Sequence, residues 1–471
     1  MTAGVRNTSP GIPRSAATRL PTTLGMTVML LLAIAWNFAA AVPEGDITLV
    51  LTHVAVVDPA GGPTQPDRTV IIRGGRIVRV EPSAGAAPEK SATVVDGRGK
   101  FLIPGLWDMH VHLSWATSGA LPALVANGVT GVRDLGSNLA EIDDWRARIA
   151  AGVLVGPAIF RAGPILNGKS FNKYQLVTGN PDQTRGVARA LKFAGVDLLK
   201  VHRRMERESY FALIEEAKAQ GLPVVGHIPM TVSPEEASDA GQAIEHTETL
   251  FEGTFAAGLK ENADLSDAIA RFRAENGEKL FARFVRNGTR VTPALAAYRS
   301  ILLSIDPAAS EDPNARYVAG SVKREFASRM GKGTPEEVAG TKRTLHELSE
   351  VVRQMRASGV TLMAGTDLAG PRVPPGFTLH EELALLVESG LSPVEALRSA
   401  TTTPAAFLKA SADYGSVEAG KRADLVLLDA DPLADIRNTR KIRAVVLNGK
   451  LLDRASLDRL LREAEEQAKQ K

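Results

Sequence analysis

Eight short apolar runs, rich in β-branched residues, alternate with helical stretches between about Pro104 and Leu408 of this 471-residue chain. In order, the runs read WDMHVHL, GVTGVRDLG, AIFRAG, DLLKVHR, LPVVGHIP, AIEHTE, TRVTPAL and TLMAGTD. Strands that alternate with helices are typical of βα units, whose strands pair in parallel. Eight such units make up a TIM barrel, so the sequence predicts an α/β fold with a (β/α)8 TIM barrel at residues 105–408. The charged helical segments 253–287 and 300–359 are expected to carry insertions that cover a site.

Two strand-rich segments flank the predicted barrel. Residues 46–104 carry Gly74 and Gly75 between two β-branched runs, and residues 409–453 carry Asn448 and Gly449 at a similar turn. Such turn residues between β-branched runs indicate hairpins. The simplest arrangement pairs the two segments into one small β-sandwich domain. Residues 454–471 are expected to form a polar, solvated helical tail.

The first 41 residues have the composition of a secretory signal peptide. Arg6, Arg14 and Arg19 precede an apolar run from Leu24 to about Trp36, and small residues follow at 39–41. The pattern predicts an exported protein, periplasmic or secreted, that contacts a membrane only if the signal stays uncleaved. Residues 1–41 contain no acidic residue, so they account for the whole formal net charge of +3. The rest of the chain has no stripe of basic residues interleaved with aromatic ones, which argues against nucleic-acid binding. Assembly into a homo-oligomer is compatible with the sequence.

Ligand-capable residues recur at the carboxyl ends of the predicted barrel strands, where active sites of this fold lie. His110 and His112 stand one residue apart in GLWDMHVHLS, so in a strand both point to one side and can bind one cation. Asp108 shares that face, and both a role in orienting a ligand and a purely structural pairing fit it. The recurring residues are His110, His112, Lys200, His227, His246 and Asp367. Burying an unpaired polar group costs on the order of several kcal/mol. The recurrence of such residues over five strands therefore favours a metal site over the alternative that they are ordinary buried polar residues of the core.

These motifs resemble those of the amidohydrolase superfamily, and within it the exported prolidase-like and imidazolonepropionase-related metal-dependent hydrolases. The resemblance rests on PGLWDMHVHL, the KV after the fourth apolar run, GHIP, IEHTE, AGTD and the closing GSVEAGKRADLVLLDADPL. It implies two divalent metal ions, the first bound by His110, His112 and Asp367 and the second by His227 and His246. It also implies that carbon dioxide carboxylates Lys200 and that the resulting carbamate bridges both ions.

A carbamate suits such a centre because it carries a negative charge and two oxygen ligands, whereas two cations would repel an ammonium. The alternative is an unmodified Lys200 that pairs with Asp367. Water held between two ions is available as hydroxide near neutral pH, and Asp367 is expected to act as general base and acid. Because the chain has no cysteine, its imidazole and oxygen ligands fit zinc first, with manganese, iron or cobalt as alternatives.

The resemblance implies a small-molecule substrate with an amide or peptide bond, such as a prolidase-like dipeptide or an N-acyl amino acid. His202, Arg203 and Tyr298 are the candidates for substrate binding. Two departures weaken peptide specificity, because His202 stands where a tyrosine is expected and GPILNGKSFNKYQ lacks a glycine- and histidine-rich stretch. A cyclic amide or lactone hydrolase with the same centre is therefore an alternative. Phosphotriester hydrolysis and a non-catalytic exported binding protein fit less well.

Overall fold

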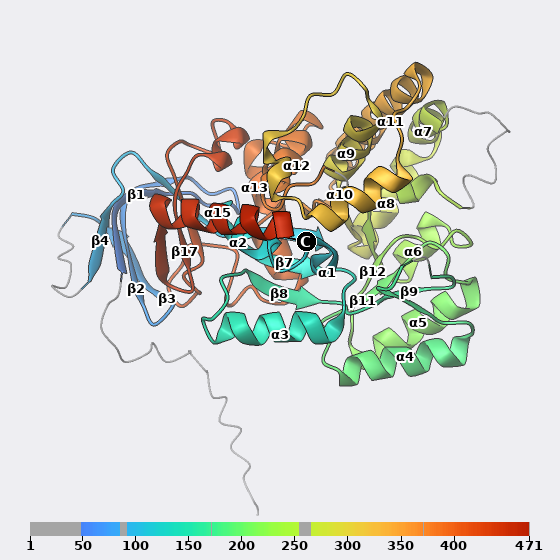
Figure 1. Ribbon diagram of the computed structural model, residues 1–471, viewed down its shortest axis with the longest axis horizontal. Helices are drawn as coiled ribbons and strands as arrows, with labels where there is room; N and C mark the ends of the chain where they lie inside the picture. The colour runs from blue at the N-terminus through green and yellow to red at the C-terminus, as the bar shows by residue number, and fades with distance from the viewer. Residues whose placement is uncertain (1–48, 85–91, 171, 254–264, 371, 471) are drawn as a thin grey trace, which may run out of the picture. The chain divides into compact units, whose positions relative to one another are not determined.

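Strands from both ends of the described chain form one mixed sheet (Figure 1). The computed structural model describes residues 49–84, 92–170, 172–253, 265–370 and 372–470, so the predicted signal peptide lies outside the described residues. The order of this sheet is β18-β17-β16-β5-β1-β2-β3, with β4 paired to β1. Its strands are β1 (Leu49–Val56), β2 (Gln65–Arg73), β3 (Arg76–Pro82), β4 (Thr93–Asp96), β5 (Phe101–Pro104), β16 (Leu425–Leu428), β17 (Ile442–Leu447) and β18 (Lys450–Asp453).

The junction between the two ends of the chain is the antiparallel pair β5 and β16, in which Leu102 lies opposite Leu427. Both predicted hairpins are present, β2–β3 and β17–β18. Leu102 and Leu427 lie in a buried apolar cluster that combines residues of both segments. The expected union of the two segments is thus observed. The predicted sandwich is not confirmed, because the described strands of these segments form a single hydrogen-bonded sheet.

The strands of the predicted barrel form two parallel sheets. One has the order β6-β7-β8 and the other β10-β9-β11-β12-β13-β14-β15. Each of the eight predicted runs contains a strand, and β9 and β10 are additional. The strands are β6 (Leu106–Val111), β7 (Val129–Asp134), β8 (Ala158–Arg161), β9 (Ile165–Asn167), β10 (Gln175–Val177), β11 (Leu199–Val201), β12 (Val224–Gly226), β13 (Ala243–Glu245), β14 (Arg290–Thr292) and β15 (Thr361–Leu362).

Both edge strands of the three-stranded sheet form hydrogen bonds with residues that flank strands of the seven-stranded sheet. Met109 in β6 donates its N–H to the carbonyl of Ala364, which follows β15, at 2.9 Å. At the other edge, the N–H of Asp197 donates to the carbonyl of Arg161 in β8, also at 2.9 Å. Among the described residues the ladders stay in two sheets, so a closed barrel is not observed as one continuous sheet. The carboxyl ends of the strands nevertheless bring their polar residues together around one cavity.

Capping residues mark the ends of several helices. Ser233 and Glu236 form a capping box at α6 (Pro234–Asp239), and Ser392 and Glu395 form another at α13 (Pro393–Ser399). Helix α5 (Arg207–Gln220) ends at Gly221, whose φ of +67° favours glycine. The other helices before the long insertions are α1 (Leu113–Ala116), α2 (Ala120–Ala126), α3 (Leu139–Ala150), α4 (Pro181–Phe193) and the 3₁₀ helix η1 (Thr247–Phe251).

The segments expected to be helical insertions are largely helical. They contain α7 (Leu265–Glu275), α8 (Gly277–Asn287), α9 (Leu295–Ile305), η3 (Pro313–Tyr317), α10 (Gly320–Arg329) and α11 (Pro335–Ser358). Helices α12 (Phe377–Glu388) and α14 (Thr402–Phe407), and the 3₁₀ helix η4 (Ile436–Arg440), complete the set. Among the described residues, no helix combines the length and apolar character needed to cross a bilayer.

The C-terminal helix α15 (Arg454–Gln470) corrects the expectation of a solvated tail. Its apolar residues recur on one face, and Leu457, Leu460, Ala464 and Ala468 are buried. The helix packs against α2, as Figure 1 shows in red beside the strands of the mixed sheet. The expectation of solvation was wrong because the many charged residues of α15 lie opposite this apolar stripe.

Candidate metal centre

Seven of the nine predicted site residues line one cavity of about 330 Å³ at the carboxyl ends of the parallel strands. A cavity of this size suits a small ligand. His110 lies beneath it, fully buried, and contacts residues that line it. Tyr298, on α9, is not among the lining residues, so the structure does not bring it together with the others. The lining residues from the prediction are His112, Lys200, His202, Arg203, His227, His246 and Asp367.

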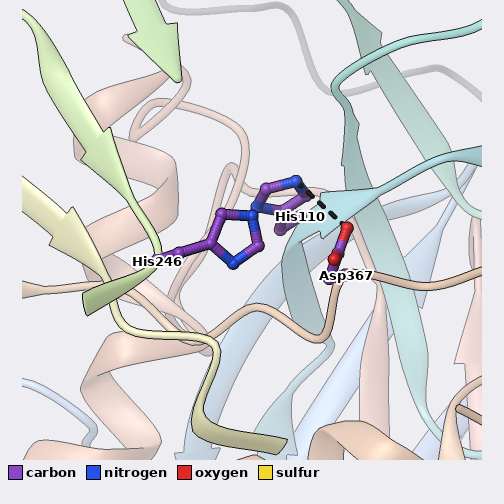
Figure 2. A group of neighbouring side chains, drawn as sticks. All are labelled: His110, His246 and Asp367. Carbon is purple, nitrogen blue, oxygen red and sulfur yellow. Dashed lines mark ion pairs between the residues drawn. The ribbon is translucent and has the colours of Figure 1, made fainter. Parts of the chain in front are cut away.

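The innermost group consists of His110, His246 and Asp367, which Figure 2 shows pointing toward one another. Their ligand-capable atoms lie within 4.8 Å of one another. The Nε2 atom of His110 lies 3.4 Å from Asp367 Oδ1, and His112 Nε2 lies 3.2 Å from the same oxygen. Lys200 Nζ lies 3.5 Å from His110 Nε2. Residues from four strand ends therefore meet at one point.

The two histidines of the HVH sequence use their ring nitrogens in the same way. Nδ1 of His112 lies 3.2 Å from the carbonyl oxygen of Gly136, and Nδ1 of His110 lies 3.0 Å from Glu245 Oε2. Both acceptors favour a proton on Nδ1, which leaves the two Nε2 atoms as acceptors facing Asp367. In this tautomer the lone pairs of the two Nε2 atoms are free to bind a metal ion.

Asp108 organises the backbone on both sides of the centre. Its Oδ1 accepts N–H bonds from His110 at 3.2 Å and from Thr366 at 3.0 Å, and its Oδ2 accepts the Thr366 hydroxyl at 2.6 Å. One carboxylate thus ties strand β6 to the residue before Asp367. Of the two roles that the sequence left open, the contacts favour positioning of the segments that carry the site.

Two site residues have unusual backbone conformations. His246 has a φ of +65° and Asp367 a φ of +55°, both in the left-handed region that non-glycine residues rarely adopt. Each residue directly follows or lies shortly after a strand end, where the chain leaves the sheet. Backbone strain of this kind is concentrated at functional sites, and here it turns both side chains toward the cavity.

The second histidine pair lies across the cavity. His227 and His246 have ring centroids 4.8 Å apart, and His202 stacks on His227 at 4.3 Å. Burial lowers the pKa of His227 well below its ordinary range and that of His246 to about 4. Neutral imidazoles are the form that binds metal, so these histidines need not lose a proton at neutral pH.

The donor set fits a group of divalent cations. The Nδ1 atoms of His227 and His246 are buried and have no hydrogen-bond partner among the described residues. Orphaned buried nitrogens are costly in an empty protein core, and a bound cation would satisfy such atoms. Burial also lowers the pKa of Lys200 to about 8. About one tenth of its amine is then neutral at pH 7, far more than for an ordinary lysine, and the neutral amine is the form that reacts with carbon dioxide.

One acidic residue in the cavity wall and a second acid close to Arg203 were not predicted from the sequence. Glu248 lines the cavity, and burial raises its pKa to about 8. Glu252 is not among the lining residues, and its Oε1 accepts a hydrogen bond from the Arg203 guanidinium at 2.8 Å. Arg203 is thus already paired with an acid, a fact that its position in the sequence did not reveal. Glu248 lies in the 3₁₀ helix η1 that follows His246, and Glu252 directly follows that helix. The second glutamate of IEHTE was the available signal for Glu248.

Beneath the centre lies a second missed pair, Glu245 and Arg133, which are both fully buried. They come from β13 and β7, and Glu245 directly precedes His246. The signal was a charged residue inside an apolar strand, as in GVTGVRDLG and AIEHTE.

Known proteins resemble this chain over most of its length. Residues 101–452 match the model of the amidohydrolase family. Imidazolonepropionase of Deinococcus radiodurans is 26% identical over 396 residues, which cover 79% of this chain and 88% of the relative. The solved structure of a candidate prolidase from Bifidobacterium longum is 27% identical, with a TM-score of 0.66, and the match covers 89% of this chain and 100% of that one. A bottromycin amidohydrolase is 24% identical with a TM-score of 0.72, covering 91% and 95%.

These structures imply a fold of the TIM-barrel type. The family match spans most of the chain, from β5 into β18, and includes every candidate metal ligand. The alternative of a non-catalytic binding protein gains no support from them. This chain therefore belongs to the amidohydrolase family and is a hydrolase that acts on carbon–nitrogen bonds.

Proposed function

We propose that this protein hydrolyses an amide or peptide bond with a centre of two divalent metal ions, zinc in the first instance. The observation that carries the proposal is the convergence of four histidines, one aspartate and one lysine from the ends of five strands around one cavity. We further propose that the two parallel sheets together form the wall of a (β/α)8 barrel, flanked by a smaller β domain.

The residues that would hold the ions divide into two groups. His110, His112 and Asp367 would hold the first ion, and His227 and His246 the second. Lys200, as a carbamate formed from its neutral amine and carbon dioxide with loss of a proton, would supply oxygen ligands to both. When bound, such ions supply Lewis acidity for the substrate carbonyl and bring the pKa of water from 15.7 down to roughly 7.

The chain's own part in the chemistry is proton transfer and orientation. Asp367 accepts a proton from the attacking water at its carboxylate and returns it to the leaving nitrogen, so that the amine departs neutral. The carbonyl of Gly136 holds the His112 ring, and Asp108 holds the backbone that carries Asp367. Each contact reduces the motion of the groups around the reacting atoms.

The leading substrates are dipeptides and N-acyl amino acids. Arg203 lines the cavity and suits a substrate carboxylate, although it also pairs with Glu252. Glu248 lies in the same cavity and suits an ammonium, which would lower its raised pKa on binding. His202 lines the wall between them and the metal ligands. A dipeptide with a free amino terminus would engage both Arg203 and Glu248.

A substrate panel tests this function. The purified protein, loaded with zinc in the presence of bicarbonate, is assayed on Xaa-Pro and other dipeptides, N-acetyl amino acids, cyclic amides and lactones. The proposal predicts the largest kcat/KM on linear amides. If cyclic amides or lactones are hydrolysed and linear amides are not, the substrate class is wrong while the metal centre stands.

Replacing Glu248 with glutamine separates the two linear classes. The change removes a charge that would pair with a dipeptide ammonium, an interaction of about 1.5–3 kcal/mol. We expect kcat/KM for dipeptides to fall about 10- to 100-fold, and kcat/KM for N-acetyl amino acids to be unchanged. Glu141→Gln, at an exposed position of α3, is the control. Equal losses on both substrate classes would contradict the assignment.

The predicted leader supports export, and we propose that cleavage follows residue 41. Sequencing the amino terminus of the protein recovered from its producing cells tests this. A mature chain that begins upstream of residue 39 would count against the cleavage site.

A further inference from the structure

The Nδ1 atom of His110 points away from the cavity, toward a buried pair of opposite charges. It lies 3.0 Å from Oε2 of Glu245, while the other oxygen of Glu245 lies 2.5 Å from a guanidinium nitrogen of Arg133. All three side chains have no exposed surface. The three side chains therefore lie in a row, Arg133, Glu245 and His110, that leads to the candidate metal site. Arg133 donates a hydrogen bond to Glu245, whereas the 3.0 Å approach of Glu245 to His110 Nδ1 lacks the alignment of a hydrogen bond.

Arg133 is itself held by the strands that carry the site. Its Nε donates to the carbonyl of Met109, the residue before His110, at 2.6 Å. It also donates to the Thr292 hydroxyl at the end of β14, at 3.1 Å. Its guanidinium lies 5.1 Å from the ring centroid of Phe407. The arginine thus joins β6, β7, β13 and β14 at the level of the metal ligands.

A buried ion pair of this kind is a poor way to gain stability. The cost of removing two charges from water often equals or exceeds their attraction, and apolar residues of similar volume commonly stabilise a core as well. Glu245 lies against Nδ1 of the candidate metal ligand His110, which points to a role for the Glu245–Arg133 pair at the metal site and not in stability. Metal-binding histidines generally donate their second N–H to a carboxylate or carbonyl, which sets the tautomer and the ring orientation.

We propose that Glu245 is a positioning residue that fixes the ring of His110 for metal binding, and that Arg133 acts through Glu245 by holding its carboxylate. Glu245 accepts the Nδ1 proton of His110, so that Nε2 presents its lone pair to the site beside Asp367 and Lys200. The backbone of His246, with its φ of +65°, allows consecutive residues to serve one centre: Glu245 contacts the His110 ring from beneath, and the His246 ring lies 4.6 Å from it. This inference rests on the proposed metal centre.

The test measures zinc affinity of metal-stripped protein by competition with a chromophoric chelator. Glu245→Gln is expected to weaken zinc binding about 10- to 100-fold and to shift the absorption bands of the cobalt-loaded protein. Adding Arg133→Met to Glu245→Gln is expected to cause no further loss of affinity, because the arginine acts through the glutamate. If Glu245→Gln does not fold, Arg133→Lys replaces it, with an expected loss of about 10-fold.

Glu382→Gln is the matched control. Glu382 is another fully buried carboxylate, and it accepts the N–H of Ala296 at 2.8 Å. Its replacement is expected to lower the melting temperature and to leave zinc affinity unchanged. Wild-type affinity in Glu245→Gln or Arg133→Lys would overturn the inference and leave the metal centre standing, as would an equal loss of affinity in Glu382→Gln. A wild-type protein that binds no metal would overturn both.

Discussion

Asp367→Asn is expected to lower kcat about 1000-fold on the best linear amide substrate. The asparagine keeps the shape of the side chain and one oxygen that can contact a metal, but it cannot accept a proton from water. In the structure Asp367 Oδ1 lies 3.2 and 3.4 Å from two histidine nitrogens, so the carboxylate is held at the centre of the site. Steady-state kinetics gives kcat, and binding of an uncleaved substrate analogue gives affinity.

The analogue is expected to bind Asp367→Asn with nearly wild-type affinity, because Arg203 and Glu248 are unchanged. Metal content is measured on the same sample, since loss of an ion would also lower kcat. Unchanged turnover with unchanged metal content would remove Asp367 from proton transfer. Loss of both ions would show that Asp367 is a metal ligand but would not test its role in proton transfer. Asp367→Glu, which keeps a carboxylate base, would then test that role.

Lys200→Ala is expected to lower activity at least about 100-fold and to reduce the metal content. The substitution removes the group proposed to bridge the two ions and leaves a hole at a fully buried position. Added acetate or propionate is expected to restore part of the activity, because a small carboxylate can occupy the hole and supply two oxygens in place of the carbamate. Activity is measured as a function of carboxylate concentration.

Lys192→Ala, at an exposed position near the end of α4, is the matched control and is expected to behave as the wild type, with no response to acetate. Full activity in Lys200→Ala would contradict a bridging role. Loss of activity that no carboxylate restores, together with retention of both ions, would favour the alternative in which the unmodified ammonium pairs with Asp367.

The alternation of strand and helix predicted the secondary structure of the central region well. All eight runs contain a strand because each is short, apolar and followed by a residue or turn that ends it. The sequence did not reveal β9 and β10, which are three residues long and have no run of their own. The pairing of the two ends of the chain was predictable because both are rich in strands. Their arrangement as one sheet was not, because it depends on how β5 aligns with β16, more than 300 residues later, and hydrophobic periodicity carries no information on that alignment.

The candidate ligands were predictable because a polar residue at the end of an apolar strand is costly unless it has a partner. Arg133 and Glu245 are also polar residues in apolar strands. Their role depends on the contact between the two side chains, and because they lie 112 positions apart in the sequence, that contact was not predictable. Tyr298 was the opposite case, since an aromatic hydroxyl after a strand looked suitable, but α9 directs it outside the group that lines the cavity. Side-chain direction on helices beyond the strand ends was the missing information.

The central claim is a centre of two metal ions built from these six residues, and elemental analysis of metal-saturated protein prepared with bicarbonate tests it most directly. His227→Ala removes a proposed ligand of the second ion, and His380→Ala is its control, because His380 is a buried histidine that bonds to Thr439 and to the carbonyl of Asn127. The account predicts about two ions per chain in the wild type and in His380→Ala, and about one in His227→Ala. At most one ion in a fully active wild-type protein would contradict it.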